Sequence, residues 1–278
     1  MSGLPPVVPP PPTRRQVGVL DLVLACDGGT TRPTRALAHA PVQLSRVRYD
    51  DLARPGAAAL TLVQLGGVLA GDRYTLDVAL GAGAEASITT AAATQVYRMP
   101  HGHAEQALSL RLEAGSDLAW LPQPLILFGG ADFRQTTRIT LGTGARLALL
   151  DVLVPGRLAR GEAFAFQRYE TRFEVEDATG RLLVAERAQL VPESAALAVP
   201  GVLAGMPVVG SLWLLGATAG ERHALGEWRP PTEAHTTVQL GHTVLPNDAG
   251  VLVRAMGHTG SAVRNALLAA LVALRAAG

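Results

Sequence analysis

The chain has 278 residues, and its 24 basic and 23 acidic residues leave a net charge of +1. All of the basic residues are arginines, which excludes a P-loop nucleotide site and a Schiff base on a lysine. The single cysteine, Cys26, excludes a disulfide framework within the chain, and the balanced charge argues against a general nucleic-acid partner.

The first segment, residues 1–15, is a Pro-rich tail that lacks the apolar core of a signal peptide. Because a chain of this length can bury enough surface to fold without disulfides or metals, we expect residues 16–278 to form one β-rich domain. The missing signal core and the absence of paired cysteines favour a cytoplasmic protein.

Alternating apolar and polar residues predict half-buried strands along much of the chain. In the clearest example, residues 74–80, every second side chain is apolar. The other predicted strands are residues 87–90, 108–112, 139–141, 164–166 and 173–175. The DATG sequence at 177–180 predicts a hairpin turn before a further strand at 181–185.

A loose internal repeat suggests how these strands are stacked. The sequences LGAGA (80–84), LEAGS (112–116) and LGTGA (141–145) share a Leu-x-x-Gly-small pattern, and their glycines, Gly83, Gly115 and Gly144, are 32 and 29 residues apart. A glycine at a fixed place in each turn predicts stacked strand–turn–strand units in a layered or helicoidal β architecture. The alternative is a set of unrelated turns in an ordinary β-sandwich.

Two long apolar segments have different interpretations. Residues 195–220 carry no charge, but two prolines and four interior glycines break this segment, so we expect buried strands and turns rather than a membrane helix. Residues 262–276 predict one long C-terminal helix capped by Ser261. Its apolar surface extends over most of its circumference, which indicates burial against the sheet or contact with a partner.

Four segments of unusual composition are typical of loops or strand ends. They are GGVLAGDR (66–73), TTAAATQVYR (89–98), WLPQPLILF (120–128) and VLVPGRLARGEAF (152–164). None contains a nucleophile elbow, and the chain has no HExxH sequence. On these residues alone the chain is a β-rich domain without a recognisable catalytic set.

Taken in this order, the four segments resemble the urease accessory protein D family, which is called H in some organisms. The motif residues that carry the resemblance or support it structurally are Gly66, Gly67, Gly71, Asp72, Tyr97, Arg98, Pro122, Gln123, Gly156, Arg157, Gly161 and Glu162. We expect Arg98 to pair with the carboxylate of Asp72 or Glu162.

The resemblance implies a non-enzymatic urease maturation chaperone. Such a protein binds the structural subunits of apo-urease and recruits the adaptor UreF and, through it, the GTPase UreG. The assembly delivers nickel, and carbon dioxide for lysine carbamylation, to the urease centre. The resemblance also implies a β-rich helicoidal fold with two helices and no tightly bound cofactor, only transient nickel.

The sequence departs from the family pattern at two positions. Pro124 follows Gln123 where the family usually has a glutamate, and Gly129 follows Phe128 where an acidic residue is frequent. If acidic residues line a nickel route in relatives, this chain must line that route with other residues.

Candidate nickel ligands are few. His101, His103 and Glu105 would lie on one face of an extended segment and could contact one ion transiently, with a solvated surface loop as the alternative. Asp72 and Glu162 are further candidate donors, although such carboxylates more often complete turns and strand ends.

Two other classes of function remain open at this stage. One is a β-solenoid hydrolase or lyase that uses Asp72 and Glu162 as paired carboxylates. The other is a ligand-binding module with Trp120, Trp213 and Trp228 as an aromatic platform, although Trp120 and Trp213 lie within apolar runs and resemble core residues.

Overall fold

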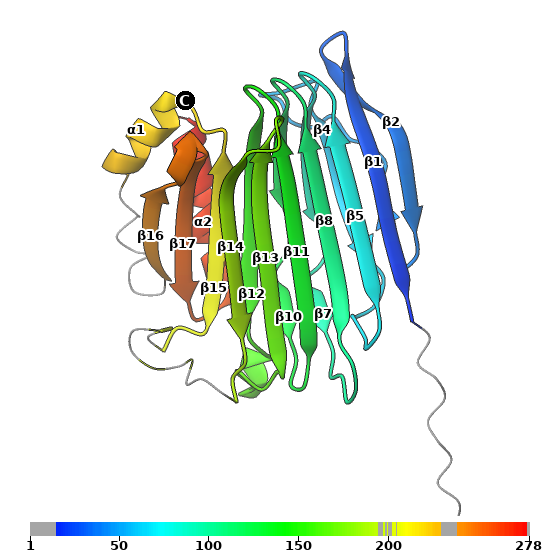
Figure 1. The fold of residues 1–278 in the computed structure, drawn as a ribbon, viewed down its shortest axis with the longest axis vertical. Coiled ribbons are helices and arrows are strands. Elements are labelled where there is room, and N and C mark those ends of the chain that lie inside the picture. Colours follow the sequence, from blue (N-terminus) through cyan, green and yellow to red (C-terminus); the bar gives the residue numbers. More distant parts are fainter. Residues whose placement is uncertain are drawn as a thin grey trace, which may run out of the picture.

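A computed structural model describes residues 15–193, 197, 199, 202–203, 205–228 and 238–276. Two β-sheets are stacked face to face, and the long C-terminal helix covers the outer side of one of them (Figure 1). Almost all of the predicted Pro-rich tail, residues 1–14, lies outside the described residues.

The first layer is a seven-stranded sheet. In spatial order its strands are β14 (Leu182–Leu190), β13 (Arg168–Asp177), β11 (Asp132–Leu141), β8 (Ala104–Leu112), β5 (Arg73–Leu80), β1 (Val17–Asp27) and β2 (Thr30–His39). The five central strands are parallel, and the two edge strands are antiparallel to their neighbours.

The second layer is a ten-stranded sheet. Its main path contains β16 (Val238–Val244), β17 (Gly250–Gly257), β15 (Val208–Leu215), β12 (Arg146–Val154), β9 (Asp117–Leu121), β6 (Glu85–Thr90), β4 (Ala58–Gln64) and β3 (Val42–Leu44). Two short strands, β7 (Thr94–Val96) and β10 (Leu125–Leu127), pair with each other, and β10 also pairs with β12.

The predicted helicoidal stacking is confirmed. The chain passes repeatedly from a strand of the seven-stranded sheet through a glycine turn to a strand of the ten-stranded sheet, as from β5 to β6, β8 to β9 and β11 to β12. Gly83, Gly115 and Gly144 occupy these turns with φ angles of 66–68°. The turns stack directly, because the amide of Gly83 donates to Ala114 O and the amide of Gly115 donates to Thr143 O, each over 3.0 Å.

Two helices lie on the ten-stranded sheet, as the family resemblance implies. Helix α2 (Gly260–Arg275) is the predicted C-terminal helix, but Thr259 rather than Ser261 is its N-cap, with its hydroxyl accepting from the amide of Ala262. Helix α1 (Ala219–Glu227) was not predicted from the residue pattern. Its sequence signal is a capping box formed by Thr218 and Glu221.

The hydrophobic core forms two layers. One cluster fills the space between the sheets and includes Trp120 and Trp213, which confirms that these tryptophans are core residues. The second lies between the ten-stranded sheet and the helices. The predicted apolar stripe of α2 is buried there, at Val263, Leu267, Leu271 and Leu274.

Two other expectations have different outcomes. Residues 164–166 are not a strand, because Phe164 has a φ angle of 55° in the turn that leads to β13. Within residues 195–220, whose placement is described only in part, the structure contains β15 and the start of α1. Among the described residues, no helix combines the length and apolar character needed to cross a membrane.

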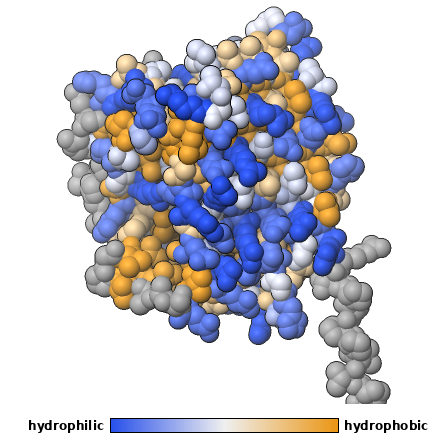
Figure 2. Space-filling model, in the orientation of Figure 1, coloured by the Kyte–Doolittle hydropathy of each residue, from blue (hydrophilic) through white to orange (hydrophobic). Residues whose placement is uncertain are grey.

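The outer face of the seven-stranded sheet is polar (Figure 2). Arginines and carboxylates pair across its strands, as in Arg73 with Glu105 at 3.3 Å and Arg187 with Glu170 at 2.7 Å.

Candidate functional site

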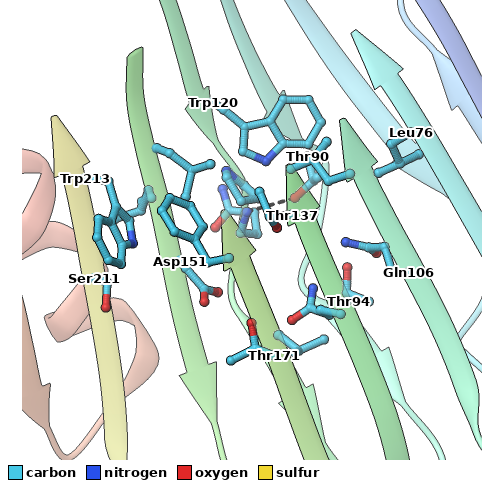
Figure 3. A pocket seen from close by; sticks show the side chains of 18 of the residues that line it. Leu76, Thr90, Thr94, Gln106, Trp120, Thr137, Asp151, Thr171, Ser211 and Trp213 are labelled. Carbon is cyan, nitrogen blue, oxygen red and sulfur yellow. Dashed lines mark hydrogen bonds between the residues drawn. The ribbon is translucent and has the colours of Figure 1, made fainter. Parts of the chain in front are cut away.

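A cavity of about 110 Å³ lies between the two sheets (Figure 3). About half of the residues that line it are polar, which is unusual for the interior of a β-sandwich. The polar lining residues are Gln64, Thr90, Thr94, Gln106, Gln123, Gln135, Thr137, Asp151, Thr171, Glu186 and Ser211. A cavity of this size and polarity is large enough for several water molecules.

The parallel register places polar side chains between the sheets in a row, and three of them, Gln106, Gln135 and Thr171, line the cavity. Tyr74 on β5 is opposite Gln106 on β8, which is opposite Gln135 on β11, which is opposite Thr171 on β13. Because the strands are parallel and in register, these side chains point from the sheet in the same direction. Phenol, amide and hydroxyl groups therefore cross the interior at one level.

Two carboxylates line the cavity where β12 of one sheet lies near β14 of the other. Asp151 on β12 is paired in register with Ser211 on β15, and Glu186 lies on β14 of the opposite sheet. Glu186 forms an ion pair with Arg254, and both side chains are partly exposed. Arg254 also lies 5.9 Å from the centre of the Trp213 ring. This ion pair therefore lies between the cavity and solvent.

The environment of Asp151 is unfavourable for a charge. Burial raises the pKa of Asp151 to about 6, and the nearby Glu186 carboxylate acts in the same direction, whereas the Arg254 guanidinium lowers it. Burial also raises the pKa of Tyr169, whose hydroxyl donates to Gln135 Oε1 over 2.6 Å. The cavity thus holds a carboxyl group whose pKa lies well above that of an ordinary aspartate.

The remaining polar groups of the cavity are only partly satisfied. Gln64 Nε2 is buried without a hydrogen-bond partner, whereas Thr90 Oγ1 accepts from the amide of Gln123 over 2.8 Å. Of the predicted motif residues, Pro122 and Gln123 line the cavity. Among the described residues, no group of three or more His, Cys, Asp or Glu side chains is arranged to hold a metal ion.

The glycine-rich loop at 66–73 is a structural support. Asp72 is fully buried, and its carboxylate accepts from the amides of Gln16, at 2.9 Å, and Leu69, at 2.8 Å. A Cβ on Gly67 would lie 2.3 Å from the ring of Tyr97, so only glycine allows this approach. Asp72 therefore closes the loop through its two backbone contacts.

Residues 156–162 form a second loop that is held by its own side chains. Arg157 binds Glu162 with two of its three guanidinium nitrogens: Nε donates to Oε1 over 3.1 Å and Nη2 donates to Oε2 over 2.5 Å. These bonds, together with one from the amide of Gly129, hold the pKa of Glu162 at about 2. Gly156, where a Cβ would lie 2.3 Å from Glu162 O, and Gly161, which ends the 3-10 helix η1 (Leu158–Arg160), shape the turn.

The expected pairing of Arg98 is wrong. Glu162 is bound by Arg157, and Asp72 by backbone amides, so neither carboxylate is left for Arg98. The Arg98 side chain is exposed and lies against Gly130. Both carboxylates are therefore engaged in contacts that hold their own loops.

The predicted nickel contacts lie in an exposed hollow. His103 Nε2 donates to Glu105 Oε1 over 2.8 Å, and His101 lines the same hollow with Asp72 and Arg73. The hydrogen bond from His103, followed by the charge of Arg73, lowers the pKa of Glu105. Transient nickel binding by His101, His103 and Glu105 stays a prediction.

The cavity residues were missed in the sequence, although a signal was present. The period-two pattern extends backward from Leu108 to Gln106, from Ile139 to Gln135, and from Phe173 to Thr171. Each of these polar residues occupies a position that the alternation assigns to the core. Several polar residues at core-facing positions of consecutive strands indicate an internal polar cavity.

Comparisons with known proteins agree with the sequence motifs. The family model described as "UreD urease accessory protein" matches residues 16–278. "Urease accessory protein UreD 2" of Streptomyces griseus is 34% identical over 249 residues, covering 88% of this chain and 85% of the relative. "Urease accessory protein UreD" of Trichormus variabilis is 36% identical over 249 residues, covering 89% and 86%. The chain belongs to the UreD family of urease accessory proteins.

Proposed function

We propose that this protein is a non-enzymatic scaffold of urease maturation in the cytoplasm. In this proposal it binds the structural subunits of apo-urease and recruits the adaptor UreF, and through it the GTPase UreG, for nickel insertion. The observation that carries the role in maturation is the family match over residues 16–278. The partners are those that the family resemblance implies.

We further propose that nickel crosses this protein through the cavity between the sheets. The polar row and the carboxylates of Asp151 and Glu186 support this proposal, because they offer oxygen ligands in an otherwise apolar core. Nickel binds imidazole more readily than oxygen donors, so this lining would hold the ion weakly. Weak binding suits a conduit, because the ion must move on to a stronger site.

The hollow with His101, His103 and Glu105 has a separate role in this proposal. Its imidazoles are suitable for a first, transient contact with nickel at the surface. Because His103 and Glu105 already bind each other, an incoming ion competes with their hydrogen bond. We therefore expect affinity in the micromolar range or weaker.

The test is reconstitution with purified partners. Tagged full-length protein is expressed with the urease subunits, UreF and UreG, and the purified complex is assayed for urease activation by nickel, bicarbonate and GTP. Co-purification of all partners, with activation that depends on this chain, is the expected result. If the chain copurified with none of them and urease were activated equally without it, the proposal would be wrong.

A further inference from the structure

A groove of about 670 Å³ lies on the other side of β10 from the cavity, beside β7, η1 and the start of α2. Figure 1 shows β7 and β10 side by side. β10 separates the two spaces, because Leu125 faces the cavity and Ile126 faces the groove. The groove takes no part in the proposed nickel path. Its walls combine an apolar floor with positively charged groups at one side.

The apolar floor is fixed in place. Ile126, Phe128 and Leu158 line the groove, and each is only half-buried. The backbone beneath Ile126 is held on both sides, since β10 pairs with β7 and with β12. Phe128 packs against Tyr97, with ring centres 5.2 Å apart, and lies under the guanidinium of Arg157 at 5.0 Å. These contacts hold the floor residues in position, so their apolar side chains stay partly exposed to solvent.

The charges of the groove have one sign. Among the described residues that line it, the ionisable side chains are Arg157, Arg160 and His258, and no aspartate or glutamate is present. Arg157 is neutralised by Glu162, whereas Arg160 and His258 are exposed and form no ion pair within the described part of the chain. Helix α2 begins at the same wall, with Thr259, Gly260 and Ser261, and its positive dipole end adds to the field.

We propose that this groove docks a segment of a partner protein that carries an apolar face and a carboxylate. The apolar face would cover Ile126, Phe128 and Leu158, and the carboxylate would lie near Arg160 and the N-terminus of α2. The complementary charge argues for an acidic segment, because a basic one would find no carboxylate on the lining.

The same charges argue against other occupants. A nucleic-acid backbone needs a run of cationic contacts, whereas Arg160 is the one arginine without an ion pair among the described residues of the lining. An anionic membrane also needs a protruding apolar surface, whereas this floor is concave. The proposal extends beyond nickel transfer, since it holds whether or not metal passes through the cavity.

The test is selection of random 12-residue peptides, displayed on phage, by the full-length protein. We expect enriched peptides to combine Leu, Ile or Phe with Asp or Glu. The dissociation constant of the enriched peptides should rise at least about tenfold in Ile126→Glu and about threefold to tenfold in Arg160→Glu. The matched control is Val272→Glu, at a residue of α2 that is 70% exposed and does not line the groove.

Arg160→Glu keeps the test valid if Ile126→Glu fails to fold, because Arg160 is exposed. Peptide binding by Arg160→Glu should also lose the dependence on salt concentration that binding by wild type shows. The proposal is overturned if no acidic, apolar peptide is enriched, or if both groove variants bind the enriched peptides as tightly as wild type. Binding of anionic phosphatidylserine vesicles that both variants abolish, or a dimer that both dissociate, would assign the groove to another occupant.

Discussion

Replacing the buried carboxyl group of the cavity, Asp151→Asn, should stabilise the protein at neutral pH. Burial raises the pKa of Asp151 from 3.8 to about 6. Each pKa unit corresponds to about 1.4 kcal/mol, so keeping the carboxyl ionised costs the folded state up to about 3 kcal/mol. Because a buried asparagine retains part of the cost of burying a polar group, we expect a gain of about 1–3 kcal/mol in the free energy of unfolding.

The gain should depend on pH in a defined direction. The pKa of Asp151 is higher in the folded than in the unfolded state, so the folded state binds the extra proton between about pH 4 and pH 6. The destabilising effect of Asp151 is therefore absent near pH 4, grows as the pH rises, and is complete above the folded-state pKa. The variant should match wild type near pH 4 and exceed it at pH 7.5.

The assay is urea unfolding followed by tryptophan fluorescence at pH 4.5, 6 and 7.5. Trp213, which stacks on Phe173 at 4.3 Å beside the cavity, makes fluorescence sensitive to this region. The same variant should activate urease less well than wild type, because it removes an ionisable ligand from the proposed path. Equal unfolding free energies of variant and wild type at pH 7.5 would refute the reasoning about burial.

Three further predictions concern the other motif residues. Glu162→Gln should destabilise the protein by about 1 kcal/mol at pH 7. Because the pKa of Glu162 is held at about 2, wild type should lose this stabilisation only as the pH falls from about 4.5 towards 2. Unfolding curves of both proteins at several pH values would measure the loss. Gly67→Ala should cost about 1–3 kcal/mol by forcing the Tyr97 ring aside, and a thermal melt equal to that of wild type would contradict the close contact. Calorimetric titration should show micromolar or weaker nickel binding that His101→Ala/His103→Ala abolishes, whereas nanomolar binding by wild type would exclude a transient contact.

Much of the architecture could be predicted, because it follows from local patterns. The alternation at residues 74–80 fixes which face of β5 is buried, and the glycine turns at Gly83, Gly115 and Gly144 require positive φ angles wherever they occur. The apolar stripe of α2 similarly identifies its buried face. Each of these signals depends on neighbouring residues alone.

The cavity could not be located in the same way. Gln106 and Gln135 become neighbours only through the register of two parallel strands, and Asp151 approaches Glu186 only because the two sheets stack. The error at Arg98 has the same origin, since its expected partner Glu162 is bound by a nearer arginine. Contacts between distant segments depend on how the layers pack, which a single sequence shows only indirectly.

In the function that we propose, this protein passes nickel to urease through its interior. The most direct test measures, by mass spectrometry, how much nickel urease contains. The urease is purified from cells that express wild type, Thr137→Trp or Thr136→Trp of this protein. Thr137 lines the cavity, whereas the neighbouring Thr136 lies on the opposite face of β11, so the pair tests the same substitution inside and outside the path.

Thr137→Val, which keeps the shape of the side chain, controls for folding. We predict that urease from Thr137→Trp cells contains little nickel although the chain still copurifies with its partners, whereas Thr136→Trp and Thr137→Val support normal loading. Fully loaded urease in Thr137→Trp cells would contradict passage through the cavity.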